Sequence, residues 1–176
     1  MKLFSRARNC LLAMLASSLL GFAPAQAAEV ATEAAVRAAL VFNFLKFTEW
    51  PAALDSNPHL QVCIASSDPE LVSAMDTLNA RKIRSKAVLV MTLRQPEGCD
   101  VIYVDSRQRW NNITEKHGKP QALTIAGYSG FVADGGMIEI ALQNNGSRFD
   151  INQGEAKQAG LRFYPQLLKL ARRVVE

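Results

Sequence analysis

Residues 60–92 read LQVCIASSDPELVSAMDTLNARKIRSKAVLVMT, and they predict one strand–helix–strand unit. The apolar run Leu60–Ala65 has the length and composition of a strand. The segment Ser67–Pro69 follows it, and a capping residue before a proline is a strong start signal for a helix, which should continue to about Asn79. Lys86–Thr92 is the second strand, with VLVM at its centre. Strands that alternate with helices are typical of α/β sheets.

The same alternation continues further along the chain. Val101–Val104 is short and fully apolar, as expected for a strand whose two faces are both covered. Asp105 and Ser106 can cap a helix to about Lys116, and Ala122–Ala126 is the next strand. The repeated pattern predicts an α/β sandwich: a mainly parallel sheet flanked by helices, Rossmann-like in architecture.

A C-terminal antiparallel hairpin is expected after this sheet. An asparagine–glycine pair at 145–146 lies between the apolar runs Met137–Leu142 and Arg148–Ile151, and this dipeptide is the strongest short-range hairpin signal. Asn152 can cap a last helical region that Gly160 interrupts. We expect the apolar residues of its final turns to pack against the sheet; they are Leu161, Leu167, Leu168, Leu170 and Val174.

Ala31–Phe47 is expected to form the first helix of the domain, ending before the Trp50–Pro51 pair. Val36, Leu40, Phe44 and Phe47 recur at helical spacing and make an apolar stripe. Most aromatic residues of this helix are better explained as core. Its exposed side is nevertheless the best candidate for a partner or dimer contact, because aromatic and basic residues are enriched at interfaces. The candidate contact residues are Arg37, Asn43, Lys46 and Trp50.

The first 27 residues have the pattern of a secretory signal peptide. Lys2, Arg6 and Arg8 precede the apolar run Leu11–Phe22, and Ala25–Ala27 is an A-x-A cleavage site. The apolar run is shorter than the roughly 20 residues that a spanning helix needs, so an uncleaved anchor is the weaker alternative. We expect export into an oxidising compartment and one mature domain over residues 28–176.

The net charge supports this division of the chain. The whole sequence has 20 Lys and Arg against 16 Asp and Glu, and three of the basic residues lie in the leader, which contains no acidic residue. The mature chain would therefore hold 17 basic against 16 acidic residues. No basic stripe alternates with aromatic residues, so the composition gives no reason to expect nucleic-acid binding.

The cysteines of the mature chain suggest a disulfide. Because Cys10 lies in the leader, only Cys63 and Cys99 remain, and two cysteines in an exported domain are most simply bonded to each other. Both lie at predicted strands, and neighbouring strands of one sheet can bring them within bonding distance. The absence of a C-x-x-C motif or a neighbouring histidine weakens the zinc and redox alternatives.

Candidates for chemistry are few. His59 and His117 occupy positions typical of solvated histidines. Asp100, Asp105 and Asp134 lie near strand ends, where α/β sheets bind ligands, but caps and turns also favour aspartate there. The sequence has no G-x-S-x-G, EF-hand or H-E-x-x-H motif. We therefore expect no catalytic residue, no cofactor and no metal site.

The run AALVFNFLKFTEWP at residues 38–51 resembles the opening signature of the YfiR family. The F-N-F-x-K-F-x-E-W-P part is its most specific piece. The resemblance covers nearly all of the mature chain, and it continues at Leu60–Ile64, Cys99–Tyr103, Leu123–Ile125, Phe131–Ile138, Arg148–Asn152 and Ala159–Ala171.

This resemblance implies a periplasmic regulatory α/β protein that forms dimers and is not an enzyme. It implies binding to the periplasmic sensor region of an inner-membrane diguanylate cyclase and its repression, which lowers cyclic di-GMP signalling and biofilm formation. Cys63 and Cys99 stand where the family's structural disulfide would be. Some members carry a second cysteine pair around Gly135–Gly136, where this chain has none. The alternative is a periplasmic small-molecule-binding sensor module that acts on a membrane kinase or another receptor.

Overall fold

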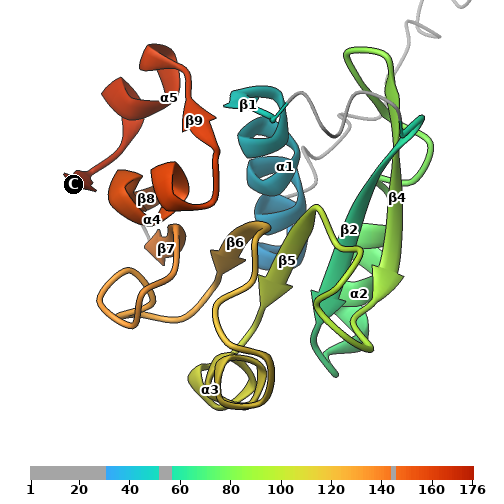
Figure 1. The fold of residues 1–176 in the computed structure, drawn as a ribbon. Helices are drawn as coiled ribbons and strands as arrows, with labels where there is room; N and C mark the ends of the chain where they lie inside the picture. The colour runs from blue at the N-terminus through green and yellow to red at the C-terminus, as the bar shows by residue number, and fades with distance from the viewer. Residues whose placement is uncertain (1–30, 52–56, 144–145) are drawn as a thin grey trace, which may run out of the picture. The chain divides into compact units, whose positions relative to one another are not determined.

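Helices and strands alternate along the chain in the computed structural model, which describes residues 31–51, 57–143 and 146–176 (Figure 1). The predicted signal peptide, residues 1–27, lies outside these described residues. The helices are α1 (Glu33–Lys46), α2 (Pro69–Asp76), α3 (Arg107–His117), α4 (Gln153–Gln158) and α5 (Pro165–Leu170). The strands are β1 (Thr48–Glu49), β2 (His59–Ala65), β3 (Lys82–Ile83), β4 (Lys86–Thr92), β5 (Val101–Val104), β6 (Leu123–Ala126), β7 (Ile138–Gln143), β8 (Gly146–Asn152), β9 (Arg162–Phe163) and β10 (Arg173–Val175).

An eight-stranded sheet organises the described residues, in the order β10-β8-β7-β6-β5-β2-β4-β3. The strands from β4 through β2, β5 and β6 to β7 run parallel. β7 and β8 form the expected antiparallel hairpin, whose pairing reaches Gln143 and Gly146. The prediction of a mainly parallel sheet with a C-terminal hairpin is therefore confirmed.

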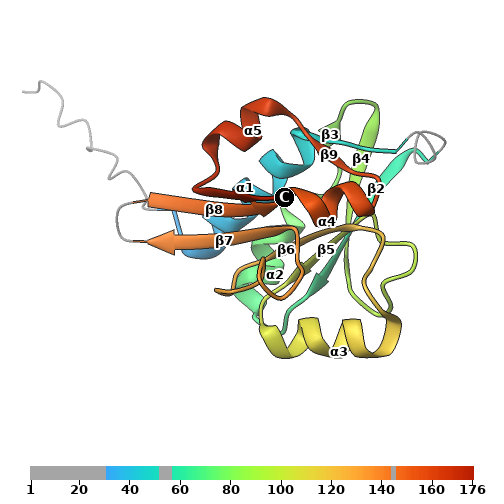
Figure 2. The same cartoon turned by 60° about the vertical axis from the view of Figure 1, so that its left-hand side comes forward.

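Helices cover both faces of this sheet (Figure 2). Buried residues of α1 and α2, such as Phe44 and Met75, share one core cluster with Val62 and Tyr103 of the strands. On the opposite face, Trp110 of α3 belongs to a second cluster. The four residues of β5 are fully buried, as expected for a strand covered on both faces.

Side-chain caps begin α1 and α2 where the sequence predicted these helices, whereas α3 begins after Ser106 without a hydrogen bond from the Ser106 side chain. The Asp68 carboxylate accepts hydrogen bonds from the backbone N–H groups of Glu70 and Leu71, and Pro69 occupies the first turn. Thr32 caps α1 through the N–H of Ala35. The chain leaves the α2 helix after Asp76, earlier than predicted, and continues through a series of turns.

The buried side of α1 differs from the predicted stripe. Val36, Leu40 and Phe47 are only partly buried. The residues that face the core are Ala34, Ala38, Val41, Phe44 and Leu45. Because Ala34 and Ala38 are small, α1 can approach the sheet closely at these positions. The larger side chains of Val36, Leu40 and Phe47 lie at the edges of the contact between α1 and the sheet.

The C-terminal region contains strands where the sequence predicted only helical turns. β9 pairs with β1, and β10 pairs in parallel with β8. The predicted packing is wrong for Leu170 and Val174, whose exposed fractions are 68% and 38%. The last residue also lies against α4, because a Cβ atom added at Gly154 would come within 2.7 Å of the carbonyl carbon of Glu176.

Candidate functional site

The four predicted contact residues of the first helix occupy different environments. Asn43 and Lys46 are exposed, whereas Trp50 is only partly exposed. The Arg37 side chain is 16% exposed and forms an ion pair with Glu33. Sequence reasoning placed these residues on one exposed side, but the structure leaves only Asn43 and Lys46 fully accessible. A partner contact by any of them stays a prediction.

Arg37 connects α1 to the sheet. Its Nη1 atom donates to the carbonyl oxygen of Gly127 at 3.1 Å and to the hydroxyl of Tyr103 at 3.4 Å. Burial raises the pKa of Tyr103, and the nearby guanidinium opposes part of that rise. The hydroxyl therefore stays protonated, and Arg37 has a structural role that an alanine variant would remove.

A basic–aromatic surface, formed by Phe42, Lys46, Arg81, Arg84 and Tyr164, lies beside the exposed part of α1. The guanidinium carbon of Arg81 is 3.5 Å from the centroid of the Phe42 ring, and the Lys46 ammonium is 6.0 Å from the same centroid. The Arg84 guanidinium lies 5.7 Å from the Tyr164 ring centroid and donates a hydrogen bond to its hydroxyl. These are cation–π geometries, which hold the basic groups in fixed positions.

Two unusual backbone positions present the arginines of this surface. Ala80 and Arg84 have φ values of 61° and 54°, a left-handed conformation that costs free energy for a residue with a Cβ atom. They flank β3, which forms a hairpin with β4 across a two-residue turn. The turn places Arg84 at the tip of the hairpin, and the preceding turn places Arg81 over Phe42.

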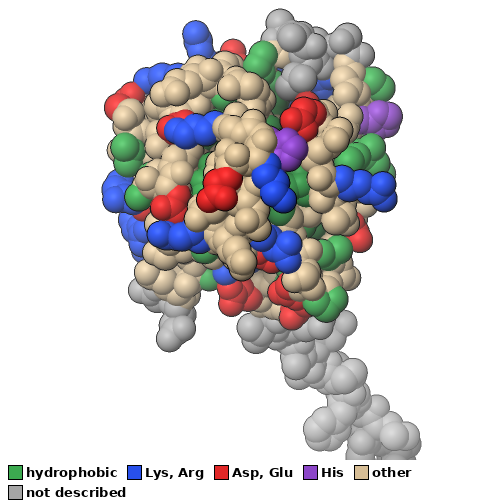
Figure 3. All heavy atoms as spheres, turned by 60° about the horizontal axis from the view of Figure 1, so that its bottom comes forward, with side chains coloured by type: hydrophobic (Ala, Val, Ile, Leu, Met, Phe, Trp, Pro, Cys, Tyr) green, Lys and Arg blue, Asp and Glu red, His purple; other side chains and the backbone are tan. Residues whose placement is uncertain are grey.

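The charge of this region favours an acidic partner. Lys82 and Arg162 add two exposed cations to the elements of the basic–aromatic surface, whereas Glu49 is the exposed carboxylate of β1. Arginine and aromatic side chains at a surface are the residue types that carry most binding energy at interfaces. The face that carries α3, by contrast, mixes basic and acidic side chains without a patch of one sign (Figure 3).

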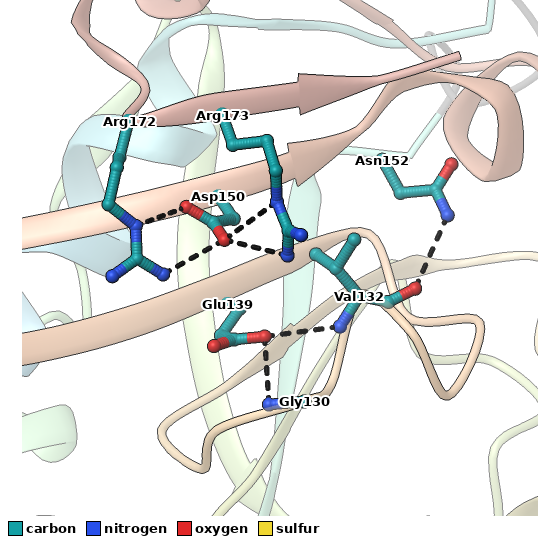
Figure 4. A network of polar contacts seen from close by, with 7 residues as sticks. All are labelled: Gly130, Val132, Glu139, Asp150, Asn152, Arg172 and Arg173. Carbon is teal, nitrogen blue, oxygen red and sulfur yellow. Dashed lines mark hydrogen bonds and ion pairs between the residues drawn. The ribbon is translucent and has the colours of Figure 1, made fainter.

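The second candidate site is an arginine–aspartate network formed by Glu139, Asp150, Arg172 and Arg173 (Figure 4). Asp150 is 1% exposed, and its Oδ1 and Oδ2 atoms accept from Nε and Nη2 of Arg172 at 2.8 and 2.9 Å. Arg173 binds the same carboxylate through Nη2 at 2.9 Å and Nε at 3.1 Å. The hydrogen bonds from Arg172 are the largest cause that lowers the pKa of Asp150.

Glu139 lies directly across the strand pair from Asp150 and holds the loop that follows β6. Its buried carboxylate accepts from the N–H groups of Gly130 at 3.1 Å and Val132 at 3.3 Å. The network residues, together with Ser129 and Gly130, line a pocket of about 490 Å³. A pocket with two arginines and two carboxylates can take a small polar molecule. The sequence analysis could not find this pocket, because residues that line it are far apart in the chain.

The disulfide between Cys63 and Cys99 is present, with Cα atoms 5.9 Å apart. It fastens β2 to the turn before β5. Cys63 is buried, and the bridge forms part of an open groove of about 650 Å³ that Gln61, Met91 and Arg94 also line. The pairing that the sequence suggested is confirmed.

The other polar candidates do not converge. Asp100 accepts from the Gln61 N–H at 2.7 Å at the start of β5, whereas Asp105 binds Arg109 at 3.0 Å beyond its end. Asp134 pairs with Arg107 at 3.2 Å. The part of the chain that the structure describes holds no group of three metal-ligating side chains.

Neither of the two histidines, which the sequence analysis expected to be solvated, lies at a candidate site. His59 is exposed at the start of β2, and His117, at the end of α3, lies 3.3 Å from the Glu97 carboxylate.

Within residues 31–51, 57–143 and 146–176, no helix has the length and apolar character that crossing a membrane would require.

The fold and these surfaces define an α/β domain with helices on both faces of a mainly parallel sheet and with surfaces suited to binding. The chain belongs to the YfiR/HmsC-like family, whose sequence model matches residues 34–172. This membership supports a role as a periplasmic regulator of diguanylate cyclase signalling, and the family is regulatory rather than catalytic. Among curated proteins, none matches the sequence.

Two solved structures are similar in fold. A conserved domain protein from Vibrio cholerae has a TM-score of 0.52 and 14% identity, over 81% of this chain and 60% of that one. The ABC domain from Streptococcus pneumonia, solved in complex with L-Trp, has a TM-score of 0.47 and 10% identity, over 66% of this chain and 55% of that one. This chain thus spans less than two thirds of either neighbour, and the Vibrio cholerae structure supports the α/β fold alone.

Proposed function

We propose that the mature protein binds the periplasmic sensor region of an inner-membrane diguanylate cyclase and represses it. Repression would lower cyclic di-GMP and biofilm formation. Family membership supports the signalling context. The observation that carries the binding role is the basic–aromatic surface, where arginines are fixed over aromatic rings at 3.5 and 5.7 Å.

The surface predicts which variants lose the partner. Arg81→Glu should weaken binding to the cyclase by about thirtyfold, because interface anchors contribute roughly 2 kcal/mol or more. Lys46→Ala should weaken binding less, because it removes one charge at the margin. Binding is measured by affinity capture from detergent-solubilised inner membranes, and repression by the cyclic di-GMP content of a deletion strain that carries each variant.

Arg148→Glu is the matched control, because Arg148 is an exposed arginine of β8 outside the basic–aromatic surface. It makes the same charge change and should keep wild-type capture. Folded Arg81→Glu and Lys46→Ala proteins that bind the cyclase with wild-type affinity would show that this surface is not the contact. A deletion strain with unchanged cyclic di-GMP would contradict repression itself.

Export is a separate prediction. The intact mass of protein released from the periplasm should correspond to a chain that begins at Ala28, because Ala25–Ala27 is a well-placed cleavage site. Ala27→Arg is the matching variant and should leave the precursor uncleaved. A wild-type mass that still includes the leader would contradict periplasmic release.

The pocket of about 490 Å³ beside the arginine–aspartate network favours a second candidate function, a sensor module for a small polar molecule that reports to a membrane kinase or another receptor. Thermal-shift screening with periplasmic metabolites tests it. A compound that stabilises the wild type but not Arg173→Ala would support this function, whereas a screen without any stabilising compound would count against it.

A further inference from the structure

The basic–aromatic surface lacks counter-charges among the residues that the structure describes. The ion pairs of this part of the chain lie elsewhere, and none of them includes a cation of the surface or of its two basic neighbours. These exposed cations are Lys46, Arg81, Lys82, Arg84 and Arg162. Glu49 lies directly opposite Arg162 across β1 and β9, but no ion pair joins the two side chains. The positive charge of this surface is therefore available to another molecule.

The two arginines that contact aromatic rings can each bind a carboxylate. At 3.5 Å from the guanidinium carbon, the Phe42 ring covers one face of the Arg81 guanidinium and leaves the N–H groups at its edge exposed. Arg84 donates one N–H to the Tyr164 hydroxyl and keeps its others. A guanidinium binds a carboxylate through two parallel hydrogen bonds, and it loses less conformational entropy when it is already held in place.

We propose that this surface is a docking site for an acidic segment of a partner protein, whose carboxylates pair with Arg81 and Arg84. That the segment belongs to the sensor region of the cyclase rests on the proposed function, whereas the need for carboxylates rests on this surface alone. The cations lie on α1, on β9, and on β3 with its flanking turns. A segment with several acidic side chains therefore matches them better than a single small anion.

A membrane rich in anionic phospholipid is the other polyanion to consider, and this surface fits it less well. Proteins that lie on a membrane combine basic groups with apolar side chains that enter the headgroup region. Phe42 and Tyr164 are partly buried and are in contact with the arginines. The large apolar side chains that are exposed in the described residues lie outside the basic–aromatic surface; they are Leu89, Met91, Leu170 and Val174.

A fluorescently labelled poly-L-glutamate chain tests this chemistry on the isolated mature protein. Fluorescence anisotropy should show binding that weakens by about tenfold or more between roughly 50 and 500 mM salt, because salt screens exposed charges. A poly-L-glutamine chain of the same length is the uncharged control and should not bind.

Arg81→Lys separates a carboxylate-binding site from a general positive field. This variant keeps the charge but replaces the planar guanidinium, with its two parallel N–H donors, by an ammonium group. Binding to poly-L-glutamate should weaken by about fivefold or more. Arg148→Lys is the matched control, since Arg148 is an exposed arginine of β8 outside the surface, and it should bind as the wild type does. Circular dichroism checks that both variants are folded.

Displacement connects the docking site to the cyclase. Poly-L-glutamate should release cyclase that the wild-type protein has captured from detergent-solubilised inner membranes, and poly-L-glutamine should not. Cyclase that stays bound at saturating poly-L-glutamate would overturn the inference without affecting the proposed repression. Arg81→Lys protein that binds poly-L-glutamate with wild-type affinity would overturn it too, as would binding to phosphatidylglycerol vesicles but not to poly-L-glutamate. If the wild type captures no cyclase, the proposed function fails, and binding to poly-L-glutamate alone decides whether this surface docks acidic segments.

Discussion

Replacing Asp150 with asparagine is expected to lower the free energy of unfolding by about 2–3 kcal/mol. The buried carboxylate binds Arg172 and Arg173 at once, and an amide nitrogen cannot accept their hydrogen bonds. This loss of unfolding free energy should lie near the lower end of the range for a broken buried ion pair, because both arginine side chains can still be hydrated. Urea unfolding followed by circular dichroism measures the change.

Asp76→Asn is the control for this variant, because Asp76 is exposed at the end of α2. It makes the same chemical change and should alter stability by less than about 0.5 kcal/mol. If Asp150→Asn unfolds at the wild-type urea midpoint, the two arginines do not hold β10 to the sheet.

Acid should reproduce part of the same loss in the wild type. The pKa of Asp150 is lower in the folded protein than its ordinary value near 4, because Arg172 donates hydrogen bonds to the carboxylate. This group therefore contributes stability above pH 4 and loses it as the pH falls through the folded pKa. The difference in stability between wild type and Asp150→Asn should shrink as the pH falls below about 4, the ordinary pKa of the group in the unfolded chain.

Removing the disulfide is the second large effect. The double variant Cys63→Ser, Cys99→Ser should lose about 2–4 kcal/mol, because the bridge closes a loop between residues 36 apart and constrains the unfolded chain. At this chain length, the melting temperature should fall by roughly 2–4 °C per kcal/mol. Differential scanning calorimetry measures both quantities.

Reductant provides the internal control for the bridge. Dithiothreitol should lower the melting temperature of the wild type and leave that of the double variant unchanged. Thiol titration of the unfolded wild type without reductant should find no free sulfhydryl in the mature chain. Two free thiols, or a double variant that melts with the wild type, would contradict the structural role of the bridge.

The central part of the fold could be predicted from sequence because its signals are local. Asp68 and Pro69 fix the start of α2 within a few residues, and the short, all-apolar Val101–Val104 is typical of a strand covered on both faces. The position of the disulfide followed for a similar reason, since Cys10 lies in the predicted leader and the other two cysteines lie at predicted strands. Each of these predictions needed no knowledge of distant contacts.

The two candidate sites could not be predicted because they depend on distant contacts. Asp150 meets Arg172 and Arg173 across more than 20 residues, and an arginine pair near a chain end looks like ordinary solvated charge. Arg81, Lys82 and Arg84 lie close together in the sequence, but no prediction was made from them. Only the folded chain shows that Arg81 lies on Phe42, 39 positions earlier.

The packing of Glu176 against Gly154 affects how the molecule can be labelled. The carbonyl carbon of Glu176 occupies space that a single added methyl group at Gly154 would fill. A fluorescent protein or affinity tag fused after Glu176 would therefore start within the packed end of β10, next to the sheet edge. Reporters for imaging or pull-down are better attached close to Ala28, after the predicted processing site, where they leave the carboxyl-terminal strand undisturbed.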